Sequence, residues 1–343
     1  MLYLYKNYLL TIVAIISFAY KAHSFNQDKT QELRNYLAAI SNKHPAQDEF
    51  SEKIYSLVMD GADPEIIIGK GGDARMLIHF AAQFGDESLI KFLKKHSENT
   101  KNKKRTKRFK ITAWFKSKKQ GASIRTYINA PSGNEYTPLM WAALYGNTEA
   151  VITLIKLGAE KEASLFLSTP LTLAAAKGNW NVVRELIYYG CDIEALDENG
   201  NTALVYAVKQ GKLDEIDYLL DHGADIDLGD KKERTPLILA IKKGNEKAFL
   251  KLIMRGAEID MKDSKGRTAL MIAARYNRLE MAIILLEHDA YIDDTDNYKE
   301  TALFHAAYKG NKRIFKYLVR QGANDKLENL QGNIAYEAYK TLL

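Results

Sequence analysis

The sequence predicts an all-α solenoid built from short helix–turn–helix units, and three observations support this fold class. A threonine-led segment recurs six times between Thr137 and Thr301, at spacings of 32, 33, 33, 33 and 33 residues. A second apolar run at helical spacing follows each segment, and it ends at a glycine or a close substitute. A fixed period of this length is typical of stacked repeats rather than of separate globular domains.

The six segments begin in the same way, with a threonine, then proline or alanine, then leucine. Threonine is a preferred N-cap because its hydroxyl accepts a hydrogen bond from a free backbone N–H. Proline suits the first helical position, where its missing N–H costs nothing. The segments read TPLMWAALYG from Thr137, TPLTLAAAKG from Thr169, TALVYAVKQG from Thr202, TPLILAIKKG from Thr235, TALMIAARYN from Thr268 and TALFHAAYKG from Thr301.

Glycines mark the helix ends within each unit, because glycine takes the left-handed conformation that commonly ends a helix. Asn277 and Asp289 replace two of these glycines, and both residue types tolerate that conformation. A stretch rich in Asp and Asn then predicts a projecting turn before the next threonine. The glycines expected to end the first helix of each unit are Gly146, Gly178, Gly211, Gly244 and Gly310.

These segments resemble the ankyrin repeat, a helix–turn–helix–hairpin unit with the signature Thr-Pro-Leu-x-x-Ala. The resemblance covers Ser132–Ala335. It implies an ankyrin-repeat solenoid with helical caps that binds another protein through its hairpin tips and the exposed side of its first helices, the concave face. The all-α solenoid is therefore expected to be a scaffold.

Weaker copies extend the pattern at both ends, as expected for the caps of a stacked array. Met76–Ala82 with Gly85 aligns with the same template, Ile54–Val58 resembles a second helix, and Gln31–Ile40 is expected to cover the open end. The predicted organisation is a signal peptide (1–24), an N-terminal helical cap with a degenerate repeat (25–60), a divergent ankyrin repeat (61–97), a basic insertion loop (98–130), six ankyrin repeats (131–328) and a C-terminal capping half-repeat (329–343).

The N-terminal segment has the features of a signal for export. Tyr8–Tyr20 is an apolar run of thirteen residues, and Ala22 and Ser24 are small residues suited to a cleavage site. As a helix the run rises about 20 Å, short of the roughly 30 Å of a bilayer core. We expect a cleaved signal and a periplasmic or secreted protein; the alternative is a membrane anchor that stays uncleaved. The single cysteine, Cys191, excludes a disulfide within the chain.

An insertion breaks the period. Leu77 and Pro138 occupy equivalent positions but lie 61 residues apart. Asn99–Arg125 holds eleven basic residues and no acidic residue, although the whole chain carries a net charge of only +6. The segment is interpreted as a solvated loop, or as a contact for anionic lipid with aromatic anchors, or as a contact for nucleic acid. The residues expected to make such contacts are Lys103, Lys104, Arg105, Lys107, Arg108, Lys110, Trp114 and Phe115.

The resemblance also indicates which residues would contact a protein partner. Register places them just before each threonine and in the pair that precedes each first-helix glycine position. None of those pairs contains an acidic residue, so we expect a basic face with interleaved tyrosines and a partner with an acidic surface or segment. Lysines that only increase solubility are the alternative. The candidates are Tyr136, Leu144, Tyr145, Lys177, Lys209, Lys231, Lys232, Arg234, Lys242, Lys243, Lys265, Arg267, Arg275, Tyr276, Tyr298, Tyr308 and Lys309.

One hairpin departs from the polar pattern. Leu165 and Phe166 stand where the other units have polar tips, in a turn that is one residue short. They are expected either to form a small exposed apolar patch that contacts a partner or to fold inward.

Little in the sequence indicates an enzyme. The seven histidines are scattered, and Gly69–Gly72 lacks the first glycine and the Ser/Thr of a phosphate loop. We expect no catalytic residues, no metal site, no cofactor and no small-molecule substrate. The predicted function is a non-enzymatic scaffold for protein–protein interaction, and export would suit an effector that acts on another cell. The alternative is a binder of anionic membrane or nucleic acid that acts through residues 99–125.

Overall fold

The computed structural model describes residues 27–40, 53–54, 56–58, 67–68, 75–101, 127–132, 134–164 and 167–340. The predicted signal peptide, most of the basic insertion (including all eight of its candidate contact residues), and Leu165 and Phe166 lie outside these ranges. The chain divides into two compact units, Met1–Leu165 and Phe166–Leu343, which we describe separately.

The first unit contains two consecutive helical pairs. Helix α4 packs against α7, and α5 packs against α8, as expected for stacked repeats. Leu77, Phe80 and Leu89 are buried in this core. His79 is fully buried, and its ring Nε2 lies within hydrogen-bonding distance (2.8 Å) of the carbonyl oxygen of Ala130. The elements are α2 (Gln27–Ile40), the antiparallel strands β1 (Ile67–Ile68) and β2 (Arg75–Met76), α4 (Leu77–Phe84), α5 (Glu87–Lys101), the 3-10 helix η2 (Tyr127–Asn129), α7 (Pro138–Tyr145) and α8 (Thr148–Lys156).

The edges of the predicted insertion loop differ from the expectation of residues 98–130. Helix α5 continues to Lys101, and η2 forms at Tyr127–Asn129. The extension of α5 is consistent with its sequence, because the helix contains neither proline nor glycine and is rich in the good helix formers Lys and Glu.

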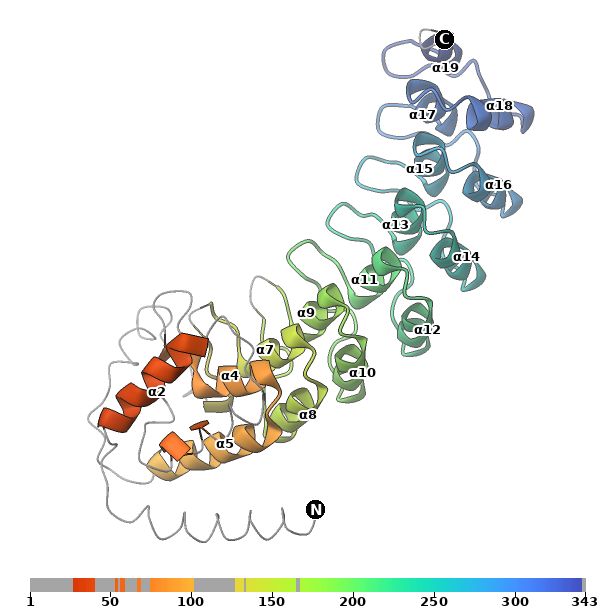
Figure 1. Cartoon of the computed structure of the whole chain (residues 1–343). Coiled ribbons are helices and arrows are strands. Elements are labelled where there is room, and N and C mark those ends of the chain that lie inside the picture. The colour runs from red at the N-terminus through yellow and green to blue at the C-terminus, as the bar shows by residue number, and fades with distance from the viewer. Residues whose placement is uncertain are drawn as a thin grey trace. The chain divides into compact units, whose positions relative to one another are not determined.

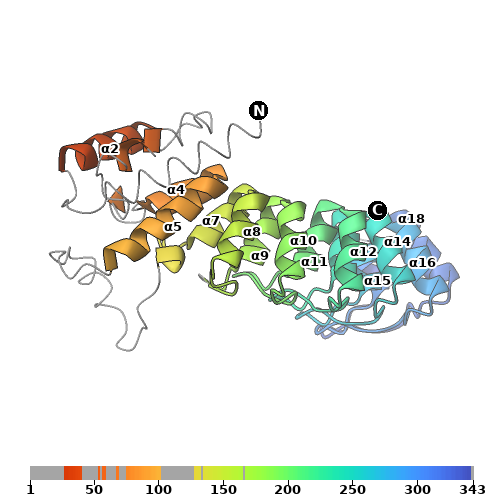
Figure 2. The ribbon, with the colours of Figure 1, turned by 90° about the horizontal axis from the view of Figure 1, so that it is seen from below.

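The second unit is a stack of helical pairs. Figure 1 shows its first helices in one row, its second helices in another, and a hairpin projecting beside each first helix. Figure 2 shows these hairpins projecting together along one edge. The first helices are α9 (Pro170–Lys177), α11 (Ala203–Gln210), α13 (Pro236–Lys243), α15 (Ala269–Arg275) and α17 (Ala302–Tyr308). The remaining helices are α10 (Trp180–Tyr188), α12 (Leu213–Asp221), α14 (Glu246–Met254), α16 (Leu279–Glu287), α18 (Lys312–Arg320) and the terminal α19 (Ala335–Lys340).

The predicted helix caps form. The threonine hydroxyl accepts from the third backbone N–H of the helix at α7, α9, α11, α13 and α15, for example from Val205 to Thr202 Oγ1 (3.2 Å). Thr301 is buried in the same extended conformation but makes no such bond. Asn277 and Asp289 adopt φ of 56° and 64°, so both glycine substitutes take the left-handed conformation as predicted.

Amide side chains tie successive repeats together. Asn245 Nδ2 donates to the carbonyl oxygen of Val208 (3.3 Å), at the end of the preceding first helix, and Asn311 Nδ2 donates to Ala274 (2.7 Å). Gln210 Nε2 makes the equivalent bond to Ala175 (2.9 Å). These contacts add a side-chain donor to carbonyl groups at the end of the preceding first helix, where the regular helical hydrogen bonds stop.

The hairpins of the second unit are joined by one backbone bond from each tip to the next. Within the described residues these bonds recur at the period of the repeat. They run from Lys231 N to Asn199 O (3.0 Å), from Ser264 N to Lys232 O (2.9 Å), from Asn297 N to Lys265 O (3.0 Å) and from Leu330 N to Tyr298 O (3.0 Å).

Among the described residues, no helix combines the length and apolarity needed to cross a bilayer.

The hairpin tips provide a test of this packing. Gly200 has φ of +74°, and a Cβ added there would lie 2.6 Å from the backbone N of Lys231. Glu233 occupies the same hairpin position with φ of 55° and is exposed.

We expect Gly200→Ala to lower the free energy of unfolding by about 1–3 kcal/mol, through strain and overpacking. We expect Glu233→Gly to change it by less, or to raise it by up to about 1 kcal/mol, because the left-handed conformation costs glycine little. Urea unfolding of both variants is the measurement; equal stability of Gly200→Ala and the wild type would contradict the close approach.

Candidate functional site

The predicted contact residues of the described chain lie at the surface. Tyr145 is 42% exposed and Tyr298 is 54% exposed. The other exposed candidates are Lys177, Lys231, Lys232, Lys243, Lys265, Tyr276, Tyr308 and Lys309, and the half-buried ones are Tyr136, Leu144, Lys209, Arg234, Lys242, Arg267 and Arg275. Leu165 and Phe166 lie outside the described residues, but the neighbouring Leu167 is 56% exposed.

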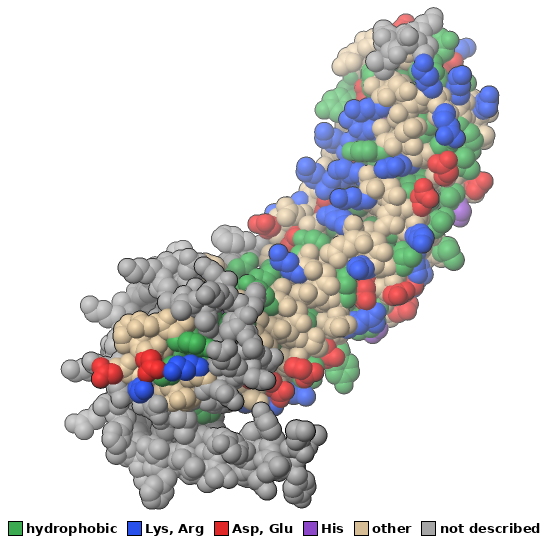
Figure 3. All heavy atoms as spheres, viewed as in Figure 1, with side chains coloured by type: hydrophobic (Ala, Val, Ile, Leu, Met, Phe, Trp, Pro, Cys, Tyr) green, Lys and Arg blue, Asp and Glu red, His purple; other side chains and the backbone are tan. Residues whose placement is uncertain are grey.

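The first helices of the second unit contain no acidic residue, whereas its second helices carry both signs, with α12 acidic and α18 basic. Figure 3 shows Lys and Arg gathered over the hairpins and first helices around α13, α15 and α17, and Asp and Glu toward the second helices. Acidic residues of α12 are partly neutralised there: Asp217 and Asp221 pair with Arg255, and Glu215 pairs with Arg184 (3.0 Å).

Each hairpin of the second unit from Asp197 onward is built on one buried carboxylate or its amide equivalent. Asp230 Oδ1 accepts hydrogen bonds from the backbone N of Lys232 (2.9 Å) and of Arg234 (3.2 Å). The same pair of bonds recurs one repeat later at Asp263. We call Asp197, Asp230, Asp263 and Asp296 the turn aspartates, and Asn329 takes their place in the last hairpin.

Two arginines complete their turn aspartates. Arg234 Nε donates to Asp230 Oδ2 (2.9 Å), and Arg267 Nε donates to Asp263 Oδ2 (3.0 Å). In each pair a second guanidinium nitrogen contacts the same oxygen. Both arginines are predicted contact residues, and the structure shows that they also donate hydrogen bonds inside the turn. The aspartates that accept these bonds were not among the predicted site residues.

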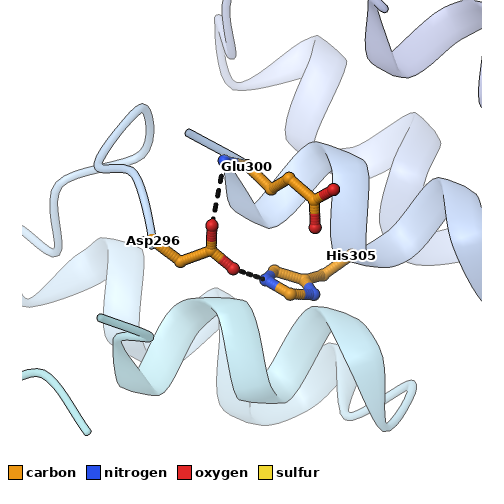
Figure 4. A group of neighbouring side chains, drawn as sticks. All are labelled: Asp296, Glu300 and His305. Atoms are coloured by element: carbon orange, nitrogen blue, oxygen red, sulfur yellow. Dashed lines mark hydrogen bonds and ion pairs between the residues drawn. The ribbon is translucent and has the colours of Figure 1, made fainter. Parts of the chain in front are cut away.

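The other two turn aspartates use an aromatic side chain from the following helix. The Tyr206 hydroxyl donates to Asp197 Oδ2, and His305 Nε2 lies 3.1 Å from Asp296 Oδ2 (Figure 4). Both aromatic residues follow their helix-capping threonine by four positions, where α13 and α15 have Leu239 and Ile272. The second carboxylate oxygen therefore bonds either to an arginine of its own turn or to a polar aromatic ring of the next helix.

A periodic signal for the turn aspartates was present in the sequence. An aspartate precedes Thr202, Thr235, Thr268 and Thr301 by five residues each time. Composition predicts only that these hairpins are polar turns, because it does not reveal which of their carboxylates is buried.

Three of the turn aspartates, Asp197, Asp230 and Asp296, have lowered pKa values, although burial by itself raises the pKa of a carboxyl group. At Asp230 the hydrogen bonds from Arg234 and from two backbone N–H groups outweigh that burial. At Asp296 the hydrogen bonds from His305 and from two backbone N–H groups lower the pKa in the same way. These carboxylates therefore stay charged in the folded protein at neutral pH.

Two lysines beside these turns also have lowered pKa values, and for a lysine this disfavours the charged form. Burial lowers the pKa of Lys242, and the positive charges of Arg234 and Arg267 lower it further. Burial also lowers the pKa of Lys209, and Arg234 contributes to that shift.

One cluster in the described residues combines types of side chain that can ligate a metal. Ligand atoms of Asp296, Glu300 and His305 lie within 4.8 Å of one another (Figure 4). Asp296 and His305 already bond to each other through Oδ2 and Nε2, so a structural role in the turn explains their proximity. The buried His305 Nδ1 has no hydrogen-bond partner in the described part of the chain.

The arrangement defines a helical repeat protein with a cationic hairpin edge, and comparison with known proteins identifies its family. A family profile described as "Ankyrin repeats (3 copies)" matches residues 46–197, 171–263 and 237–329. The chain belongs to the ankyrin repeat family, which confirms the predicted family and the all-α solenoid. Ankyrin repeats are generally protein–protein interaction modules, and proteins built from them are typically non-enzymatic scaffolds.

A solved structure is similar to this chain. It is the ankyrin repeat domain of Bcl-3, which its title describes as a unique member of the IkappaB protein family. The two sequences are 31% identical and the TM-score is 0.53. The match covers 60% of this chain and 98% of that chain.

Exchanging one form of turn for the other tests the role of His305. His305→Leu leaves Asp296 beside Glu300 without its ring partner, so we expect a loss of about 1–3 kcal/mol in the free energy of unfolding at neutral pH. Glu300→Arg in the same chain recreates the pairing of Asp230 with Arg234, and we expect it to restore most of the loss. Thermal unfolding of the two single variants and the double variant measures the coupling.

The pH dependence of this loss has a defined sign. A carboxyl group with a lowered folded pKa stabilises the protein above its unfolded pKa of about 4 and ceases to do so as the pH falls through its folded pKa. The loss of stability caused by His305→Leu should therefore become smaller as the pH falls below about 4.

If the double variant were no more stable than His305→Leu alone, the interchangeable roles of arginine and the aromatic ring would be contradicted.

Proposed function

We propose that this protein is a non-enzymatic scaffold that binds an acidic surface or segment of a partner protein on the hairpin and first-helix face of its repeats. The observation that carries the proposal is the row of cations on that face, where Lys242 lies near the positive charges of Arg234 and Arg267, and Lys209 lies near that of Arg234. An acidic partner would relieve this repulsion. Complementary charge of this kind increases the association rate and discriminates against basic partners.

Exposed tyrosines supply apolar area on the same face. Tyr276 is 39% exposed at the end of α15, Tyr308 is 38% exposed at the end of α17, and Tyr298 is at a hairpin tip. Tyrosine is a common interface anchor, since its rigid ring brings a large contact area at a small entropic cost. An interface of about 800 Å² per partner would be of ordinary size.

The basic insertion supports a second candidate function, the binding of anionic membrane or nucleic acid. Its support is the sequence of residues 99–125, with eleven basic residues and none acidic. Most of that segment lies outside the described residues.

Affinity capture from the native cell separates the two functions. We expect the dominant captured partner to survive deletion of residues 99–125 and to be lost, by about tenfold or more in recovery, when Tyr145, Lys243 and Tyr276 are changed to Ala. Lys247→Ala is the matched control, because Lys247 is exposed on α14 in the same repeat as Lys243 but on the second helix. Retention by the triple variant with loss on deletion would favour the insertion instead.

We also propose that the protein is exported through residues 1–24, as their apolar run and small residues suggest. Mass spectrometry of the protein purified from its native cell should find a mature N-terminus after Ser24. Recovery of intact Met1 from the cytosol would refute cleavage and export.

A further inference from the structure

The hairpin tips carry cations in a fixed register. The backbone bond from Ser264 to Lys232 holds two tips side by side, and the bond from Asn297 to Lys265 holds the next pair. Lys232 and Lys265 occupy the same position in successive hairpins and are both exposed. The backbone of each tip is therefore placed by its neighbour and not only by its own loop.

Two arginines of these hairpins have side chains whose conformation is restricted by hydrogen bonds. Arg234 and Arg267 occupy equivalent positions one repeat apart, and Asp230 and Asp263 hold their guanidinium groups. Their side chains remain 18% exposed. A guanidinium has five N–H donors, so the two that bind the aspartate leave others for a carboxylate of a partner. Less entropy is lost on binding because the aspartates already orient the groups.

Two lysines of the first helices extend this set. Lys242 interacts electrostatically with both Arg234 and Arg267, and Lys209 interacts with Arg234. We call Lys209, Lys232, Arg234, Lys242, Lys265 and Arg267 the cationic strip. Asp230 and Asp263 pair with two of its six charges, Asp197 also attracts Lys209, and the exposed Glu233 lies between Lys232 and Arg234 in the chain. The strip stops at the next repeat, where Glu300 stands at the position of the arginines.

The repeat spacing of the strip restricts the conformation of what it binds. Packed helices lie about 8–10 Å apart, so equivalent cations in successive repeats recur at about that distance. A polyproline II segment rises about 3.1 Å per residue with three residues per turn, so every third side chain lies on the same face, about 9 Å from the last. In a β-strand, by contrast, residues three apart point to opposite faces.

We propose that the cationic strip binds an extended acidic segment of a partner protein in a polyproline II conformation, with a carboxylate at every third residue along the direction of the repeats. This inference rests on the proposed function and adds the conformation and spacing of the ligand. Segments rich in like charge repel themselves and extend, so an acidic chain loses little conformational freedom on docking here. Arginine donors match carboxylates in a forked geometry.

Synthetic peptides of identical composition test the spacing. One carries glutamate at every third residue between prolines and serines, a second carries the same glutamates at every second residue, and a third carries them as one block. We expect the first to bind the full chain about tenfold more tightly than the others by fluorescence anisotropy at low salt. Lys232→Gln combined with Lys265→Gln should weaken the first peptide about tenfold and remove the preference for spacing. Lys247→Gln on α14 should change neither.

Several results would overturn the inference while leaving the proposed function intact. Equal affinity for the three peptides would mean that the face recognises charge without register. Failure of all three to bind, with a captured partner still lost in the face variants, would mean that the partner is not an extended acidic segment. A further result would contradict the proposed function as well: single-stranded RNA that displaces the first peptide and binds more tightly would indicate a nucleic-acid ligand for the strip.

Discussion

The geometry of each hairpin in the second unit from Asp197 onward depends on one buried acceptor side chain. A turn aspartate, or Asn329 in the last hairpin, accepts two backbone N–H groups through one oxygen. A buried carboxylate is costly unless its lone pairs are satisfied, and here the turn itself supplies most of the donors. The backbone conformation that results brings each tip within hydrogen-bonding distance of the next.

The same carboxylates shape the charged surface. Because Asp230 and Asp263 each hold an arginine, two cations are fixed at the edge of the face instead of moving freely in solvent. Where a tyrosine or histidine bonds to the aspartate, the position of the arginine is occupied by Asn201, which is buried and also donates to Asp197, or by the half-buried Glu300. A substitution at this position of the repeat is therefore expected to alter both the stability of the turn and the charge of the surface.

Much of the candidate surface followed from the sequence because a strict period fixes which residues share a face. Once the threonines were aligned, the pre-glycine residues such as Lys243 and Tyr276 had to emerge at the same edge, and the structure leaves both exposed. Contacts between groups far apart in the repeat could not be found in that way. The bonds of Asp197 to Tyr206 and of Asp296 to His305 span nine residues and a change of direction, and the pKa of Lys242 is lowered by burial and by positive charges from two hairpins.

The sequence by itself determined the all-α repeat fold, the capping threonines and the positions where left-handed backbone is needed, since each depends on local steric and hydrogen-bonding preferences. It also determined the uneven distribution of charge. Only the tertiary structure decided which polar groups are buried, which arginines are already paired, and that neighbouring tips are joined by backbone bonds. Those properties depend on the distance between groups from different repeats, and a periodic sequence indicates the face on which a residue lies but not what comes within hydrogen-bonding distance of it.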